Sequence, residues 1–290
     1  MSTHSDLSYT SIDGLTLYAR DYAAHSGPAR LPVICIHGLT RNSSDFDELA
    51  PWIASLGRRV IAVDVRGRGR SDSDPNPAKY NPMVYAGDVI KLAEDLGIER
   101  AVFVGTSMGG IITMTLALRR LGLIAAAVLN DVGPMLSEKG LARIAGYAGK
   151  ACVLTSWEQA TDYIMTINQQ AFPANDLAEW SKWARRAFTE NEQGQLVLRY
   201  DPHIAMPLQA GKLKPTSWMG RVAFRRLARN RPVLLVRGAL SDLVEDEQAH
   251  YMRRAAPGMQ YALVPGVGHA PMLTEPPARS AIEEFLSQVD

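Results

Sequence analysis

The sequence predicts an α/β fold in which helices flank a mostly parallel central sheet, and three observations support it. Short apolar runs rich in β-branched residues recur along the chain. Segments with apolar residues at helical spacing separate these runs. The 290 residues, 47% of them hydrophobic, are enough for a sizeable core. Strands that are apolar on both faces belong to a parallel sheet covered by helices.

The predicted elements follow one another in a regular order. Near the N-terminus, two alternating runs around Asp13-Gly14 predict a hairpin over residues 7–22. Buried strands are predicted over 31–38, 58–67, 99–107, 125–133, 231–239 and 259–267. Amphipathic helices are predicted over 43–57, 81–97, 108–122, 245–258 and 276–289.

One long stretch interrupts this alternation. Residues 134–230 contain successive helical patterns with no strong strand between them. We therefore expect a helical cap over 134–230, inserted into an α/β core made of 1–133 and 231–290. Four of the five tryptophans fall in this insertion, and their helical spacing favours packing between cap helices over a role in a pocket wall.

Charge and targeting signals narrow the classes of function. The 31 Lys and Arg nearly balance the 30 Asp and Glu, which argues against nucleic acid as a partner. The polar N-terminal segment does not resemble a signal peptide, and no uncharged apolar run reaches membrane-spanning length, so no membrane insertion is expected. The two cysteines, Cys35 and Cys152, form no disulfide or metal pattern, and a cytoplasmic location is expected.

The segment VFVGTSMGGIITMTL, residues 102–116, predicts a sharp turn at Ser107. A strand that ends at Gly105 and a helix that begins after Ser107 leave almost no linker, and Gly105 and Gly109 remove side chains that would collide. The turn exposes the Ser107 hydroxyl at the carboxyl end of the sheet and leaves the Met108 amide at a helix N-terminus. A lone G-x-S-x-G also fits a helix N-cap, but the flanking strand and helix favour a nucleophile.

The chain resembles the α/β-hydrolase fold family, in particular its capped members that need no cofactor. The resemblance extends from Ser8 to Val289 and rests on HGLT at 37–40, DVRGRGRSD at 64–72, GTSMGG at 105–110 and VGHAPMLTEPP at 267–277. It implies a serine hydrolase, since haloalkane dehalogenases and epoxide hydrolases of this fold use aspartate where Ser107 stands. It also implies that the backbone N–H of Leu39 is the second oxyanion donor beside that of Met108.

A serine nucleophile needs a base and an acid that orients the base. Among the six histidines, His269 is the candidate base because it lies in a glycine-rich loop after the last strand, where the resemblance places the base. His37 is expected to shape the oxyanion loop instead. The preferred acid is Asp242, in the loop after the strand that follows the cap. The alternative acid is Asp131, at the end of the strand before the cap, where it could also simply cap the turn.

No cofactor and no metal are expected. The glycines in 64–72 match neither the dinucleotide-binding nor the P-loop spacing, and no pattern of metal ligands occurs. By resemblance, this segment is a structural turn beside the sheet, and Asp64, Arg66 and Ser71 are expected to belong to its hydrogen bonding.

These residues together predict two-step hydrolysis of a small carboxylic ester through an acyl-enzyme on Ser107. The expected partner is a small-molecule substrate with an apolar part, because the predicted cap contains Met, Trp and Phe and covers the serine. A lactonase or carbon–carbon bond hydrolase with the same triad stays open, as does a slow-hydrolysing ligand receptor of this fold. Arg41 could pair with a substrate carboxylate, although a solvent-exposed loop arginine is the favoured interpretation.

Overall fold

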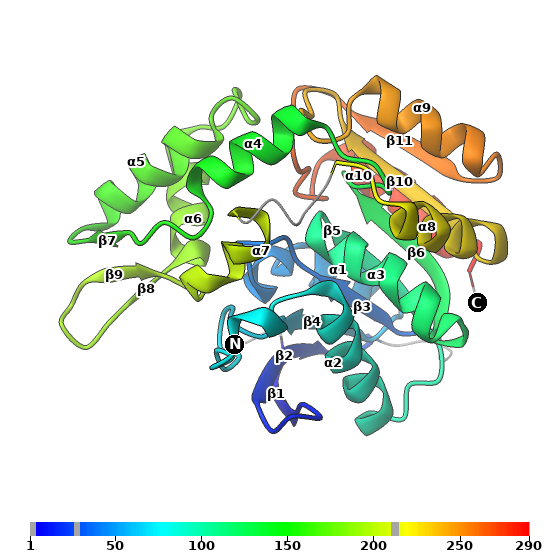
Figure 1. Ribbon diagram of the computed structural model, residues 1–290, viewed down its shortest axis with the longest axis horizontal. Coiled ribbons are helices and arrows are strands. Elements are labelled where there is room, and N and C mark those ends of the chain that lie inside the picture. The colour runs from blue at the N-terminus through cyan, green and yellow to red at the C-terminus, as the bar shows by residue number, and fades with distance from the viewer. Residues whose placement is uncertain (1–3, 26–29, 210–214, 290) are drawn as a thin grey trace.

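The chain forms an eight-stranded sheet with helices on both faces (Figure 1). The structure, a computed structural model, describes residues 4–25, 30–209 and 215–289. The strand order is β1-β2-β4-β3-β5-β6-β10-β11. β1 pairs with β2 and β2 with β4 in antiparallel fashion, and the other neighbours pair in parallel. The predicted α/β class with a mostly parallel sheet is therefore confirmed.

The strands lie where the apolar runs predicted them. The N-terminal hairpin consists of β1 (Ser5–Thr10) and β2 (Thr16–Tyr22). The parallel strands are β3 (Val33–Ile36), β4 (Val60–Asp64), β5 (Ala101–Thr106), β6 (Ile124–Asn130), β10 (Val233–Gly238) and β11 (Gln260–Val264). β3, β4, β6 and β10 are buried along their whole length, because helices cover both faces of the sheet.

Two groups of helices cover the sheet. On one face lie α2 (Pro82–Asp95), α3 (Met108–Arg119), α8 (Trp218–Asn230) and α9 (Asp246–Ala255), and on the other lie α1 (Leu49–Ser55) and α10 (Pro276–Ser287). Short 3-10 turns occur at Ser43–Phe46, Pro77–Lys79, Leu121–Leu123 and Pro202–Ala205. α2 illustrates how the sequence starts a helix: the Asn81 side chain accepts hydrogen bonds from two first-turn amides, and Pro82 occupies the first helical position.

Between β6 and β10 the chain leaves the sheet and forms a separate group of elements, at the left and top of Figure 1. Its helices are α4 (Glu138–Tyr147), α5 (Trp157–Asn168), α6 (Leu177–Ala187) and α7 (Met206–Gln209). A small antiparallel sheet joins them, in the order β7 (Val153–Leu154), β9 (Leu196–Leu198) and β8 (Phe188–Glu190). The sequence predicted no strand here, because strands of two or three residues are too short to show an alternating pattern.

Aromatic side chains hold this group together. Trp180 and Trp183 are buried, with their rings stacked at a centroid distance of 5.7 Å, and Phe172 meets both rings edge-on. Packing between cap helices was the favoured interpretation for these tryptophans. Trp218 behaves differently, since 78% of it is exposed at the start of α8.

α8 lies outside this group, although its residues fall within the insertion that was expected over 134–230. It packs against α3 on the core, where Phe224 and Leu227 are buried and Arg226 Nε donates to the Ala117 carbonyl over 2.7 Å. The separate group of elements thus ends before Trp218. Helical periodicity predicted the helix itself, but it does not specify which layer an amphipathic helix joins.

The segment 64–72 is the structural turn that was expected. The Asp64 carboxylate accepts from the backbone amides of Ser43 and Arg70 over 2.6 and 2.8 Å, and the Ser71 hydroxyl donates to the Asp64 carbonyl. The buried Arg66 guanidinium forms ion pairs with Asp13, Asp74 and Asp88. The bond from Ser43 ties the turn that follows β4 to the loop that follows β3.

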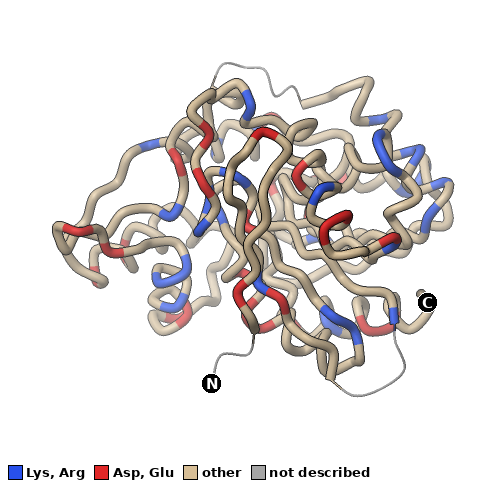
Figure 2. The backbone as a smooth tube through the Cα atoms, turned by 90° about the horizontal axis from the view of Figure 1, so that it is seen from below, with Lys and Arg blue, Asp and Glu red and all other residues tan. Residues whose placement is uncertain are grey.

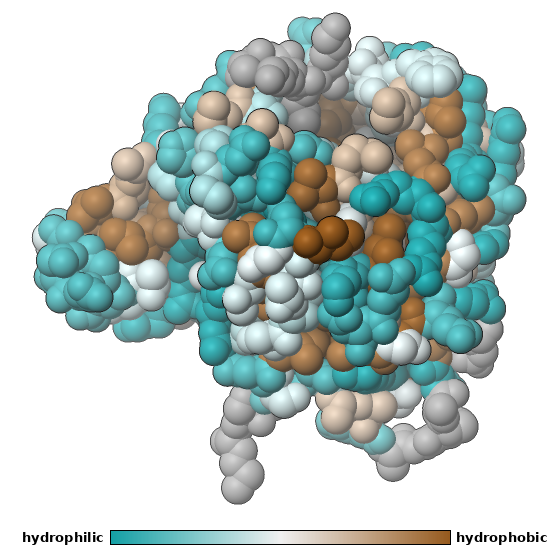
Figure 3. Space-filling model, turned by 60° about the horizontal axis from the view of Figure 1, so that its bottom comes forward, coloured by the Kyte–Doolittle hydropathy of each residue, from teal (hydrophilic) through white to brown (hydrophobic). Residues whose placement is uncertain are grey.

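The surface carries both signs of charge and scattered apolar groups. Figure 2 shows Lys and Arg interspersed with Asp and Glu, and α8 contributes four arginines. Brown apolar surface in Figure 3 occurs in separate groups among teal residues, including some on the cap lobe at the left. In the described part of the chain, none of the helices is both long enough and apolar enough to cross a membrane.

Candidate active site

Ser107 occupies a tight turn between β5 and α3. Its φ of +51° lies in the left-handed region, which serine seldom adopts. A Cβ on Gly105 would lie 2.5 Å from the Gly109 carbonyl carbon, and one on Gly109 would lie 2.0 Å from the Ile36 carbonyl oxygen. Both glycines are therefore required for strand and helix to approach so closely. The Ser107 amide donates to the Asn130 carbonyl over 3.0 Å, which ties this turn to the end of β6.

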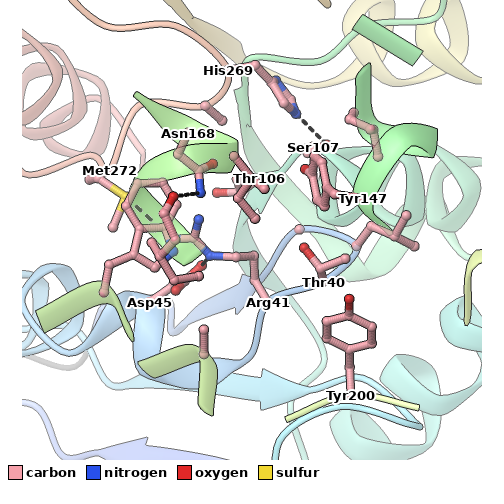
Figure 4. Close-up of a pocket in the computed structure, with 18 of the residues that line it drawn as sticks. Thr40, Arg41, Asp45, Thr106, Ser107, Tyr147, Asn168, Tyr200, His269 and Met272 are labelled. Carbon is pink, nitrogen blue, oxygen red and sulfur yellow. Dashed lines mark hydrogen bonds and ion pairs between the residues drawn. The ribbon is translucent and has the colours of Figure 1, made fainter. Parts of the chain in front are cut away.

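His269 faces the serine from the loop after β11. Its Nε2 lies 2.9 Å from Ser107 Oγ (Figure 4). Three contacts hold this loop in place: the Gly268 amide donates to the cap residue Ala171, the Leu240 amide donates to Val267, and the Asn130 side chain donates to the Pro271 carbonyl. The loop of the candidate base is thus held by Ala171 between α5 and α6, by the loop after β10 and by the end of β6.

Asp131 is the third side chain, beside Ser107 and His269, in a continuous chain of hydrogen bonds. Its Oδ2 accepts from His269 Nδ1 over 2.8 Å and from the Ser241 hydroxyl over 2.6 Å, and its Oδ1 accepts from the Gly238 amide over 3.0 Å. The side chain is fully buried, and its φ of +53° is one that aspartate tolerates better than most residues. Because the carboxylate accepts at Nδ1, that nitrogen carries the proton and Nε2 is left to accept from Ser107.

The structure does not bring Asp242, the preferred acid of the sequence analysis, to the imidazole. Its two carboxylate oxygens instead accept from Nε and Nη2 of Arg143 on α4, over 2.5 and 2.9 Å. Burial opposes ionisation of Asp242, but the hydrogen bonds and charge of Arg143 outweigh it and lower the pKa of the carboxyl. The loop after β10 therefore turns Asp242 toward the cap, and the carboxylate from the end of β6 takes the place beside His269.

Leu39 and Met108, whose amides are the expected oxyanion donors, line a common pocket with Ser107. Met108 is the first residue of α3, so its amide has no intrahelical acceptor. Leu39 follows His37 and Gly38 in the loop after β3 and lines the same cavities as Ser107. His37 shapes this loop: its Nδ1 donates to the Gly38 carbonyl over 2.7 Å, and its Nε2 accepts from the Val65 amide over 3.1 Å. Burial lowers the pKa of His37 to about 3, so the ring is neutral.

Two pockets meet at Ser107. The first, here the Arg41 pocket, spans about 900 Å³ including its solvent-open part and is lined by Arg41, His269, cap residues and the loop after β11. In Figure 4, Arg41, Asp45 and Met272 lie on one side of this pocket, and Tyr147 and Tyr200 lie on the other.

The second pocket, here the apolar pocket, spans about 650 Å³ including its solvent-open part. It is lined mainly by aliphatic side chains of α3, α4 and the adjoining loops: Met108, Ile111, Val132, Leu136, Leu141 and Leu243. Leu39, Ser107 and Ile144 line both pockets. A substrate whose reacting carbonyl reaches Ser107 can therefore extend into two chemically different spaces.

Sequence reasoning missed several residues of the Arg41 pocket. Arg41 itself, for which a solvent-exposed loop position was favoured, lines the pocket with its side chain four-fifths buried. Tyr147, Asn168 and Tyr200 come from the cap and were not singled out at all. Polar residues on the buried side of amphipathic cap helices are the only signal that the sequence offered for Tyr147 and Asn168.

Comparison with known proteins identifies the family. The model of a family described as "Alpha/beta hydrolase family" matches residues 33–282, which include β3, the Ser107 turn, Asp131 and His269. The chain belongs to the alpha/beta hydrolase family. A crystal structure of an alpha/beta hydrolase from Novosphingobium aromaticivorans superimposes with a TM-score of 0.92, at 39% identity and with 100% of both chains covered.

Two curated proteins named as hydrolases are similar to this chain over most of their length. The 3-hydroxybutyrate-oligomer hydrolase of Cupriavidus necator is 33% identical over 278 residues, which are 93% of this chain and 94% of that protein. The 2-(acetamidomethylene)succinate hydrolase of Mesorhizobium japonicum is 27% identical over 262 residues, 89% of this chain and 86% of that protein. The chain is therefore an enzyme of the hydrolase class.

Proposed function

We propose that this alpha/beta hydrolase cleaves small carboxylic esters with Ser107 as nucleophile, His269 as base and Asp131 as the acid. The observation that carries the proposal is the unbroken chain of hydrogen bonds from Ser107 Oγ through His269 Nε2 and Nδ1 to Asp131 Oδ2. The Ser107 turn also supports the proposal. Serine seldom adopts this backbone conformation, and such strained conformations occur at positions that present a reactive side chain.

In the first step, Ser107 Oγ attacks the ester carbonyl carbon while His269 Nε2 takes the hydroxyl proton. The carbonyl electron pair moves onto oxygen, and the amides of Leu39 and Met108 hold this oxyanion. Asp131 stabilises the imidazolium through Nδ1. When the oxyanion collapses, the bond to the leaving oxygen breaks, and Nε2 passes its proton to that oxygen.

In the second step, water attacks the acyl group on Ser107 and gives a proton to His269 Nε2. The second tetrahedral intermediate collapses, the bond to Ser107 Oγ breaks, and Oγ recovers the proton from Nε2. One ester and one water thus yield one carboxylic acid and one alcohol, and the three side chains return to their starting state.

The elements between β6 and α8 act in this proposal as a cap that shields the serine and shapes the substrate site. α4 and α5 contribute Tyr147, Ile164 and Asn168 to the Arg41 pocket, and α4 contributes Leu141 to the apolar pocket. Two pockets that are partly open to solvent and meet at Ser107 fit a small substrate with an apolar part. The name of the Cupriavidus relative specifies oligomers of 3-hydroxybutyrate, which are esters of a hydroxy acid, and such compounds belong in the substrate panel.

The test is steady-state hydrolysis of acyl esters, lactones and 3-hydroxybutyrate dimers by the native protein and by Ser107→Ala. We expect esters to be turned over many times per active site and Ser107→Ala to lose activity by several orders of magnitude. Ser287→Ala, at an exposed serine in α10, is the matched control and should retain full activity. Ester turnover that survives in Ser107→Ala would overturn the proposal, as would a native protein that binds these compounds without turnover.

A further inference from the structure

We infer that the Arg41 pocket selects substrates whose alcohol half carries a free carboxylate, and that the apolar pocket receives the acyl half. The substrates would then be acyl esters of small hydroxy acids. This inference rests on the proposed ester hydrolysis at Ser107 and adds to it which half of the ester occupies which pocket. It also assigns Arg41 as the residue that determines specificity.

The position of His269 determines which pocket receives the alcohol half of the ester and which receives the acyl half. The base must give its proton to the leaving oxygen, so the alcohol half has to lie on the side of the imidazole. His269 lines the Arg41 pocket and is not among the residues of the apolar pocket. The aliphatic lining of the apolar pocket suits a hydrocarbon acyl chain and offers no partner for a charged one.

Arg41 is held rigidly with one edge of its guanidinium uncommitted. Its Nε lies 2.7 Å from Asp45 Oδ2, and its plane stacks on the Trp183 ring, with Cζ 4.1 Å from the centroid. Nη2 contacts only a thioether, Met272 Sδ at 3.5 Å, which is a weak acceptor. Within the described residues, Nη1 has no hydrogen-bond acceptor. The two terminal nitrogens are therefore available to a carboxylate in the bidentate geometry that arginine favours.

Asp45 orients the guanidinium without occupying its terminal edge. Its carboxylate faces Nε, and its side chain is largely buried. The stacked Trp183 and the Asp45 pair fix the plane of the guanidinium before substrate arrives, so little rotamer entropy is lost on binding. Arg41 is also the one Lys or Arg among the described residues that line the two pockets. An anionic group that enters the Arg41 pocket would meet this positive charge, whereas the described residues that line the apolar pocket include no cationic side chain.

Arg41 and the nucleophile lie close enough for one small molecule to reach both. A Cβ built on Gly38 would lie 3.5 Å from Arg41 Cγ and 3.7 Å from Ser107 Cβ, so the two side chains flank the same glycine. In this proposal, a carboxylate a few carbons from the ester oxygen reaches the guanidinium while the ester carbonyl lies at Ser107. Figure 4 shows the guanidinium extending away from Ser107 along the pocket, toward Asp45 and Met272.

The test compares matched esters in kcat/KM. The first is the butanoyl ester of 3-hydroxypropanoate, the second is its neutral carboxamide, and the third carries the carboxylate on the acyl half, as the monoethyl ester of butanedioate. We expect the kcat/KM of the native protein to be at least tenfold higher for the first ester than for the second, mostly through a lower KM. The kcat/KM for the third ester should not exceed that for the second.

The decisive variant is Arg41→Gln combined with Asp45→Asn, because removing the arginine alone would leave the Asp45 charge buried and unpaired. This variant should lose about tenfold to a hundredfold in kcat/KM for the first ester, so that its kcat/KM values for the first ester and for the carboxamide become similar. Arg59→Gln with Asp21→Asn removes a similar ion pair on the sheet surface and should leave the preference unchanged.

Equal rates on the first two esters, or a preference that survives in the Arg41 variant, would overturn the inference. An Arg41-dependent preference for the third ester would overturn the assignment of the two halves. Ester hydrolysis that requires Ser107 but shows no carboxylate preference leaves the proposed function standing. The absence of any hydrolysis that depends on Ser107 would instead contradict the proposed function.

Discussion

Replacing Asp131 by asparagine should lower kcat by about four orders of magnitude, because the change alters charge while keeping shape. The carboxylate accepts three hydrogen bonds, from His269 Nδ1, the Ser241 hydroxyl and the Gly238 amide. An asparagine has only one acceptor oxygen, so its amide group must face at least one of these donors. Either the imidazole turns to the other tautomer, or a buried donor loses its partner.

The expected magnitude follows from these contacts. A 10⁴-fold loss in kcat corresponds to about 5.5 kcal/mol of transition-state stabilisation. A buried donor without a partner destabilises the folded protein by about 1–3 kcal/mol, so Asp131→Asn should fold but unfold at lower urea concentration. Asp242→Asn is the matched variant. It removes the ion pair with Arg143 and leaves the hydrogen bond between Asp131 and His269 intact, so we expect kcat to change less than about fivefold while stability falls by a similar 1–3 kcal/mol.

The assay is single-turnover and steady-state hydrolysis of a butanoyl ester, with circular dichroism to establish that each variant is folded. Because both variants should lose comparable stability, a difference in kcat isolates the role in catalysis. An Asp131→Asn enzyme that retains a tenth of native kcat, or an Asp242→Asn enzyme that loses activity more severely, would refute the assignment of Asp131 as the acid.

Two further predictions concern the framework around the serine. Burial lowers the pKa of His37 to about 3 from 6.5, so the unfolded chain binds one more proton than the folded chain between these values. As the pH falls below 6.5, this group should therefore lower the free energy of unfolding by about 1.4 kcal/mol per pH unit. Urea titrations between pH 5 and 8 should show that the free energy of unfolding depends less steeply on pH in His37→Gln than in the native protein. An unchanged pH dependence would contradict this prediction. Gly109→Ala should prevent native folding or abolish activity, since its Cβ would lie 2.0 Å from the Ile36 carbonyl oxygen. Gly146→Ala in α4, where a Cβ meets nothing within 4 Å, should stabilise by about 0.5–1 kcal/mol, and a native-like melting curve for Gly109→Ala would refute the packing argument.

The nucleophile turn and the sheet were predictable because local patterns determine them. The β-branched run before Gly105 and the apolar periodicity after Ser107 define a strand and a helix without reference to the rest of the fold. The same holds for β6 and β10, whose apolar runs are buried throughout. Packing on both faces of a parallel sheet leaves a strong signal in the sequence.

The choice between Asp131 and Asp242 depended on geometry that sequence does not encode locally. Both residues follow neighbouring parallel strands, so both loops emerge at the same edge of the sheet. Which carboxylate meets His269 is decided by backbone dihedrals at Asp131 and by Arg143 on the cap. A short polar residue at a strand end before a glycine, in LNDVG, is a weak signal for the left-handed conformation seen there.

The cap was the least predictable region for a related reason. Its helices are amphipathic, but periodicity does not tell whether the apolar face of α8 meets α3 or another cap helix. The three strands of its small sheet are held by pairing with one another, which a short sequence window does not reveal. Arg41 was likewise expected to be exposed to solvent, and its burial was not predictable because Trp183, the ring beneath its guanidinium, lies far away in the sequence.

The most direct test is intact-mass analysis after reaction with a serine-reactive fluorophosphonate, on the native protein and on Ser107→Ala. A hydrogen-bonded serine, histidine and aspartate should give one phosphonyl adduct per native chain and none on the variant. Asp131→Asn should react far more slowly, and Asp242→Asn at nearly the native rate. An unlabelled, correctly folded native protein, or labelling that persists in Ser107→Ala, would contradict Ser107 as the activated nucleophile of this hydrolase.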